Sequence, residues 1–178
     1  MMKSSIKLIA AAFAASALFF AGNVNAQTKT EESPWKLGLG IELGAPTGNA
    51  HTVSNFELGG TARLQYNAAE NFAWTLTSGY YNMFGKEIPG VTGVNYKSIG
   101  IVPLKAGFKA FFASNLYFGA EAGAGFETAS GGNTKFILSP TLGFANKTWD
   151  VGARYENFSG QSDSYGLVGL RIAYAFSL

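Results

Sequence analysis

The residue best suited to catalysis is His51, the only histidine, with Ser54 three positions later. A histidine that contacts a serine can activate the hydroxyl as a nucleophile, so this pair could support acyl transfer or hydrolysis. No Gly-x-Ser-x-Gly sequence or comparable set of partners accompanies it. We therefore interpret His51 as a water-exposed loop residue, and the sequence predicts no catalytic residue.

Other chemistry is poorly represented. The absence of cysteine excludes disulfides, Cys-ligated zinc and thiol catalysis, and the scattered carboxylates lack metal-ligand spacing, so we expect no cofactor and no metal. Gly38-x-Gly40 and Gly123-x-Gly125 lack the G-x-G-x-x-G pattern of nucleotide-binding turns. The 13 basic and 11 acidic residues give a formal net charge of only +2, which is too small a basic excess to indicate binding of nucleic acid.

Residues 1–26 have the pattern of a cleaved secretory signal peptide. Lys3 and Lys7 precede an uncharged apolar run over residues 8–22, and Val24-Asn25-Ala26 is a small-x-small cleavage sequence. The run is short for a membrane span, which needs about 20 residues. Removal of this segment leaves 11 basic against 11 acidic residues. Residues 27–34 would then form a short N-terminal tail before a barrel domain over residues 35–178.

The remaining chain alternates apolar and polar residues with the period of a β-strand. We predict strands at residues 35–45, 56–66, 72–81, 98–111, 116–127, 135–145, 149–158 and 165–176. Short connections (67–71, 112–115 and 146–148) alternate with longer ones (46–55, 82–97, 128–134 and 159–164). This alternation is typical of an antiparallel up-and-down transmembrane β-barrel, with short turns at one end and long loops at the other.

A soluble lipocalin-like barrel would show the same alternation with its apolar face turned inward. Three features favour the membrane arrangement. The polar faces carry many glycines, which would make room for long side chains in a narrow lumen. The apolar faces carry no charge, and large aromatic residues gather at strand ends, as in the aromatic girdles of membrane barrels. The girdle residues that we predict are Trp35, Tyr66, Phe72, Trp149, Phe176, Phe56, Tyr80, Phe126 and Phe158.

The polar faces hold nearly balanced charges. Counting from the short-turn ends places three acidic and three basic residues in one layer: Glu42, Lys105, Glu121, Arg154, Glu156 and Arg171. Buried charges must be paired, and side chains can fill an eight-stranded barrel. We therefore predict a salt-bridged plug; a narrow solute-selecting conduit is the alternative.

The stretches SIGIVPLKAGFKAFFASNLYFGAEAGAGFE (98–127) and GLRIAYAFSL (169–178) resemble the small outer-membrane β-barrel, or porin-like, domains of Gram-negative bacteria. This resemblance implies a location in the outer membrane, contacts with its lipid and lipopolysaccharide, and insertion by the barrel-assembly machinery. The chain departs from the family in one respect, because it ends Phe176-Ser177-Leu178 where an aromatic residue is common.

The expected function is that of a non-enzymatic integral outer-membrane protein with a plugged polar lumen and a role in envelope structure or surface interaction. The alternatives are a narrow porin-like channel, a lipid-modifying enzyme that uses His51 at the rim, and a soluble lipocalin-like binder. The long loops, above all 83–94 and 128–134, could bind a surface ligand. Eight strands can close alone, so the sequence sets no oligomeric state.

Overall fold

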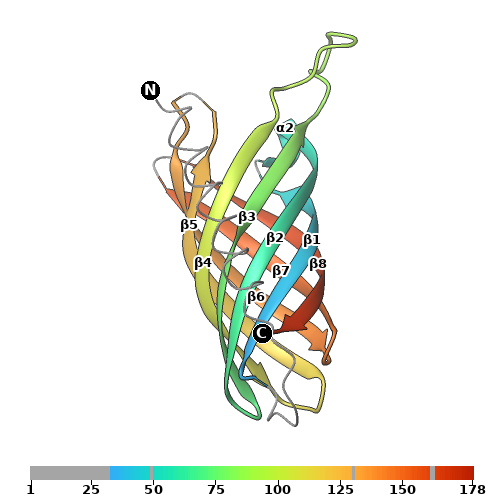
Figure 1. Ribbon diagram of the computed structural model, residues 1–178. Helices are drawn as coiled ribbons and strands as arrows, with labels where there is room; N and C mark the ends of the chain where they lie inside the picture. The colour runs from blue at the N-terminus through green and yellow to red at the C-terminus, as the bar shows by residue number, and fades with distance from the viewer. Residues whose placement is uncertain (1–32, 49, 130, 161–162) are drawn as a thin grey trace.

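The computed structural model describes residues 33–48, 50–129, 131–160 and 163–178, and its strands form one closed antiparallel barrel (Figure 1). The strands are β1 (Trp35–Thr47), β2 (Ser54–Ala69), β3 (Phe72–Gly85), β4 (Ile99–Phe111), β5 (Leu116–Glu127), β6 (Thr134–Ala145), β7 (Trp149–Gly160) and β8 (Asp163–Ser177). Each strand pairs with the next, and β8 pairs with β1. The prediction of an eight-stranded up-and-down barrel is confirmed.

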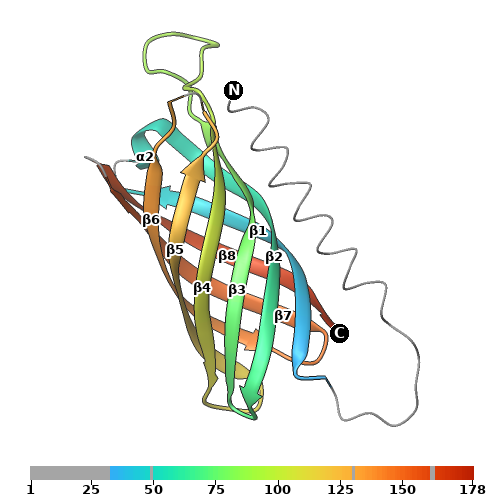
Figure 2. The same ribbon diagram turned by 60° about the vertical axis from the view of Figure 1, so that its left-hand side comes forward.

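The two ends of the barrel differ in the lengths of their connections. Turns at 70–71, 112–115 and 146–148 close one end, and the longer connections at 48–53, 86–98 and 128–133 lie at the other (Figure 2). The prediction of a long connection at 159–164 was wrong, because β7 continues to Gly160 and β8 begins at Asp163, with Ser159 paired to Ser164. The 86–98 loop begins as a hairpin extension, in which Tyr96 donates its N–H to the Lys86 carbonyl at 2.7 Å. The first long loop also contains a single helical turn, α2 (Ala50–Val53), which the sequence does not predict. No helix in the described ranges has the length and apolar content that a membrane span requires.

The polarity of the barrel is that of a membrane protein. Large apolar side chains point outward along the strands, among them Leu39, Ile41 (59% exposed) and Leu142 (61% exposed). Every charged strand residue whose burial is described is buried or half-buried. This inverted arrangement contradicts the lipocalin-like alternative, in which the apolar face would line the interior.

Glycines on the inward faces make room for bulky neighbours. A Cβ at Gly143 would lie 2.5 Å from Tyr117 Cζ, and a Cβ at Gly59 would lie 2.5 Å from Tyr81 Cδ1. Tyr117 and Tyr81 are themselves fully buried in the lumen. The glycines therefore allow two large rings to fit inside a barrel that is only wide enough for side chains.

A lumen that is polar along its whole length was predicted, and this prediction was wrong. Toward the long-loop end the inward positions carry a buried apolar cluster formed by Tyr81, Met83, Ile101, Ile137, Phe158 and Leu167. We call this set the apolar layer. It lies where β3 and β7 end and where β4, β6 and β8 begin, so it closes the lumen on the long-loop side of the charged residues.

Candidate functional site: a ring of ion pairs in the lumen

The six residues assigned to one layer from the sequence are brought together in the structure. Arg171 Nε lies 3.2 Å from Glu42 Oε1, and Arg154 contacts the other Glu42 oxygen. Arg154 Nη2 is 3.4 Å from Glu156 Oε2, and Glu156 pairs with Lys105. Lys105 Nζ then lies 3.7 Å from Glu121 Oε2. The six side chains thus form one continuous row of alternating charges.

Two residues outside that predicted layer close the row into a ring. Arg63 Nη2 lies 3.0 Å from Glu121 Oε2, and Arg63 Nη1 lies 3.3 Å from Asp150 Oδ2. Asp150 Oδ2 is also 3.0 Å from Arg171 Nη1, which returns to the starting residue. The resulting ion-pair ring alternates in sign throughout and consists of Glu42, Arg154, Glu156, Lys105, Glu121, Arg63, Asp150 and Arg171.

One further charge is attached to each side of the ion-pair ring. Lys109, near the short-turn end of β4, places Nζ 2.6 Å from Asp150 Oδ2. Glu57, near the long-loop end of β2, places Oε1 3.7 Å from Arg154 Nη2. The ten charges sum to zero, but the surplus cation lies toward the short turns and the surplus carboxylate toward the long loops.

Neutral side chains supply further hydrogen bonds to the ring. Thr77 and Thr75 donate to Glu121 Oε1 at 2.6 and 3.0 Å. The Tyr117 hydroxyl donates to Asp150 Oδ1 at 2.7 Å, and the Thr61 hydroxyl donates to Glu42 Oε1 at 2.5 Å. Both Glu57 oxygens, in contrast, lack a hydrogen-bond donor. Because buried charges are tolerated when paired and hydrogen-bonded, the ring is a packed internal structure, and Glu57 is a weakly held carboxylate attached to its side.

The possible catalytic pair is not assembled. The Ser54 hydroxyl is buried and donates to the Phe84 carbonyl at 2.8 Å. His51 lies exposed on α2, where Lys86 Nζ donates to its carbonyl at 2.5 Å and lies 3.4 Å from its Nε2.

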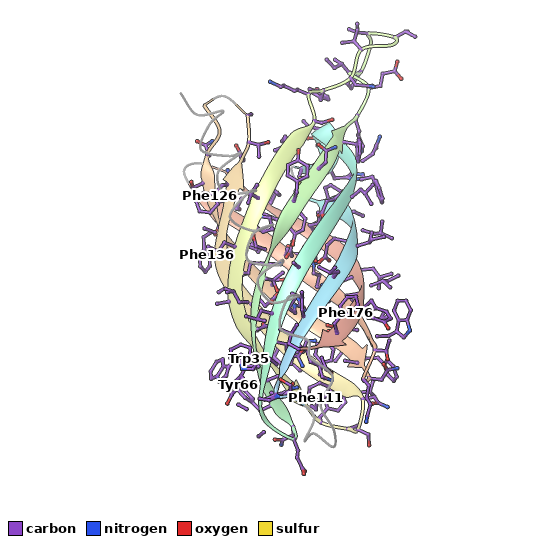
Figure 3. All side chains as sticks on the ribbon, in the orientation of Figure 1. Trp35, Tyr66, Phe111, Phe126, Phe136 and Phe176 are labelled. Atoms are coloured by element: carbon purple, nitrogen blue, oxygen red, sulfur yellow. The ribbon has the colours of Figure 1, made fainter. Side chains whose placement is uncertain are left out.

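The aromatic residues assigned to the girdles lie on the outer surface with one exception. Trp35 and Tyr66 make contact at 4.7 Å between ring centroids near the short turns, and Phe126 lies toward the opposite end (Figure 3). The outward members of the predicted set are Trp35, Tyr66, Phe72, Trp149, Phe176, Phe56, Tyr80 and Phe126.

The exception is Phe158, whose assignment to a girdle was wrong. Phe158 is fully buried and stacks on Tyr165 at 4.9 Å in the lumen. It lies two residues after Glu156 and four after Arg154, so the period-2 alternation of β7 directs it inward with them. Its position at a strand end suggested a girdle residue, but strand parity decides the direction of its side chain.

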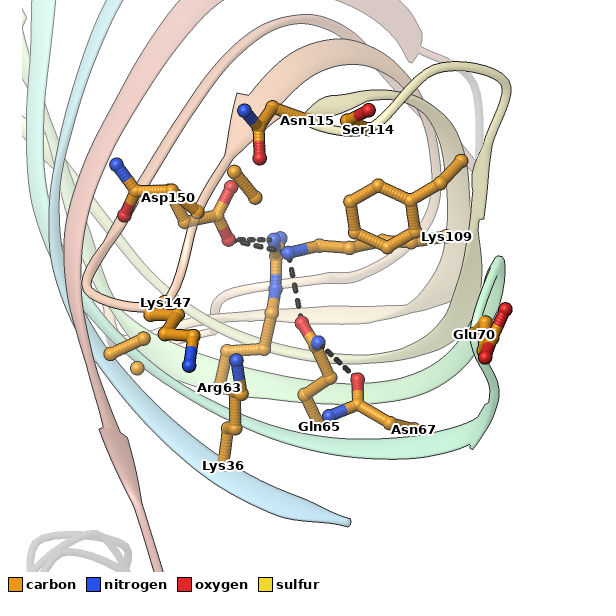
Figure 4. A pocket seen from close by; sticks show the side chains of 15 residues that line it. Lys36, Arg63, Gln65, Asn67, Glu70, Lys109, Ser114, Asn115, Lys147 and Asp150 are labelled. Atoms are coloured by element: carbon orange, nitrogen blue, oxygen red, sulfur yellow. Dashed lines mark hydrogen bonds and ion pairs between the residues drawn. The ribbon is translucent and has the colours of Figure 1, made fainter. Parts of the chain in front are cut away.

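A cavity of about 420 Å³ opens at the short-turn end of the lumen (Figure 4). Its floor includes Arg63, Lys109 and Asp150, and Lys36 and Lys147 lie along its wall. Lys109 Nζ donates to Gln65 Oε1 at 3.0 Å, and Gln65 Nε2 donates to Asn67 Oδ1 at 2.7 Å. The ion-pair ring is therefore accessible from one side as the floor of this cavity, which we call the short-turn vestibule.

The fold and its inverted polarity define the class of this protein, a small eight-stranded β-barrel of the outer-membrane type. Comparison with known protein families finds no match, and no curated protein matches the sequence. Solved structures match the fold at low sequence identity. The Yersinia pestis outer membrane protein Ail in a phospholipid bilayer nanodisc aligns with a TM-score of 0.57 and 14% identity, covering 79% of this chain and 99% of Ail.

Two other solved barrels align similarly. The N-terminal β-barrel domain of Pseudomonas aeruginosa OprF gives a TM-score of 0.55 at 12% identity, over 82% of this chain and 100% of that domain. Neisserial surface protein A gives 0.52 at 11% identity, over 82% of this chain and 98% of that protein. At these identities the similarity establishes a shared fold.

Proposed function

We propose that the protein is a non-conducting, non-enzymatic integral barrel of a Gram-negative outer membrane, with a role in envelope structure or surface interaction. The observation that carries this proposal is the filled lumen. The ion-pair ring occupies the middle of the barrel and the apolar layer lies on its long-loop side. Their side chains are buried on both levels, so the interior has the character of a packed core.

Recording from planar bilayers tests the absence of conduction. The purified wild-type protein is expected to give no stable conductance step at either polarity. The double variant Phe158→Ala, Arg171→Ala removes one large side chain from the apolar layer and one from the ion-pair ring. It serves as the control with an opened lumen. A reproducible ion-selective step from the wild-type protein, altered by Arg171→Ala alone, would instead establish the porin-like alternative.

The absence of enzymatic activity has its own test. His51→Ala is expected to leave the lipid A profile of the producing strain unchanged, since Ser54 and His51 each have other partners. Lys86→Ala provides the matched control, because it removes the neighbour of His51 without removing the imidazole. A lipid A species lost in His51→Ala alone would contradict the proposal.

The remaining partners follow from the proposed location. The exposed apolar belt would contact membrane lipid and lipopolysaccharide, and the long loops would face outward, where they could meet a surface ligand. Insertion would require the barrel-assembly machinery after export. The predicted signal peptide over residues 1–26 lies outside the described residues, and N-terminal sequencing of the membrane form is expected to begin at Gln27.

A further inference from the structure

The short-turn vestibule carries an excess of positive charge. Four cations line it (Lys36, Arg63, Lys109 and Lys147) against two carboxylates, Glu70 and Asp150. Asp150 offsets only one of these positive charges, although its Oδ2 oxygen faces three cations. Arg63, Lys109 and Arg171 lie 3.3, 2.6 and 3.0 Å from it.

The two charges attached to the ion-pair ring account for this polarity. Lys109, one of the four cations, faces the vestibule, while Glu57 lies on the far side of the ring beside the apolar layer. A low-dielectric wall strengthens such a field within a cavity. The vestibule is thus the positive end of an otherwise neutral plug.

The polar side chains of the vestibule also favour an anion that bears hydrogen-bonding groups. The chain of hydrogen bonds from Lys109 through Gln65 ends on the Asn67 side chain, whose NH₂ group is a donor. Asn115 and Asn146 add further amides to the lining. The volume of about 420 Å³ falls within the usual size of small-molecule sites, about 300–1,000 Å³.

The deep guanidinium is already fully engaged by the protein. Arg63 uses Nε to donate to Thr77 and its two Nη atoms to contact Asp150 and Glu121. It therefore has no free edge for the bidentate contact that carboxylate and phosphate groups both prefer, which leaves the lysines and the amide donors to hold an anion. We propose that the short-turn vestibule binds a small anionic solute, carrying a carboxylate or a phosphate group, with amide or hydroxyl groups. The compartment that supplies this solute, the periplasm, follows from the proposed membrane location.

The probe for this site is the dipeptide Ala-Glu, added to refolded protein in detergent micelles and followed by NMR chemical-shift changes. We expect saturable shifts confined to the short-turn end, with an apparent Kd that weakens as NaCl rises from low to physiological concentration. Lys36→Gln is expected to weaken binding about 2- to 5-fold. The matched control is Lys97→Gln, an exposed lysine at the long-loop end that should leave binding unchanged.

Three results would overturn the proposal: no saturable binding, equal binding of the uncharged N-acetyl-Ala-Gln amide, or shifts at the long-loop end. Tighter binding of Ala-Glu than of inorganic phosphate would assign the site to carboxylates, and the reverse order would assign it to phosphate groups. The wild-type and both variants should keep the same heat-dependent gel mobility, since Lys36 and Lys97 lie outside the ion-pair ring. Loss of binding with that mobility retained separates failure of this inference from failure of the proposed barrel.

Discussion

At the residue scale, the ion-pair ring shows how far position along a strand predicts contact. The row from Arg171 to Glu121 was predictable because its members have similar heights above the short turns and lie on inward positions. Arg63 and Asp150 were not, because strands in a barrel are tilted and staggered. The staggered register and the reach of a guanidinium bring a β2 residue to Asp150 on β7, across the lumen.

Neutralising either of two buried carboxylates, Glu121 in the ion-pair ring or Glu57 beside it, should have contrasting effects on stability. Glu121→Gln removes a charge that contacts Arg63 and Lys105 and accepts from Thr75 and Thr77, so two buried cations lose a partner. We expect a loss of about 3–5 kcal/mol in the free energy of unfolding. Glu57→Gln, the matched control, should cost under about 1 kcal/mol, because no donor reaches its oxygens.

Urea unfolding of the protein in lipid vesicles, followed by tryptophan fluorescence, measures both variants. Equal losses for Glu121→Gln and Glu57→Gln would contradict the unequal roles assigned to them.

The inward glycines give a second residue-scale prediction. Gly143→Ala would place a Cβ 2.5 Å from the Tyr117 ring. The ring cannot easily move, because Tyr117 is buried and its hydroxyl donates to Asp150. We expect a destabilisation of about 1–3 kcal/mol. At the outward Gly60 the nearest atom is 4.0 Å away, so Gly60→Ala should be neutral or slightly stabilising by the same unfolding assay.

At the element scale, the strands were predictable to within a few residues because each has an apolar outer face and a turn at either end. The differences lie at the long-loop end, where β2 begins at Ser54 and β3 extends to Gly85. At that end, the hydrogen bonds between neighbouring strands continue beyond the residues that show a clear alternation of apolar and polar side chains. Helix α2 could not be predicted, because a four-residue turn carries no helical periodicity.

If the outward face of β1 contacts lipid, the cost in stability of placing a charge there should depend on how deep the position lies in the membrane. Ile41 lies near the middle of the strand and is 59% exposed, so Ile41→Arg would place a charge in hydrocarbon. We expect it to cost about 2–4 kcal/mol of stability in vesicles. Val91 is 49% exposed in the 86–98 loop, and Val91→Arg should change stability by less than about 0.5 kcal/mol. A similar cost at both positions would contradict a membrane-facing β1.

At the scale of the whole molecule, two filled levels close the barrel. The charged level was predictable from sequence, since balanced charges on inward positions must pair. The apolar layer was not, because Ile101, Ile137 and Leu167 interrupt the expected polar face only near the strand ends. The alternation along each strand does place these three residues on inward positions. They were not predicted to fill the lumen because the inward face was expected to be polar throughout.

The central claim is that this chain forms a closed barrel that spans a membrane. Detergent extraction of membranes, followed by gel electrophoresis of unheated and heated samples, tests it most directly. Because every strand edge is paired, the barrel should resist the detergent until heated. The account predicts that the protein requires detergent for release and migrates differently before and after heating. Release by osmotic shock without detergent, together with identical mobility in both samples, would contradict it.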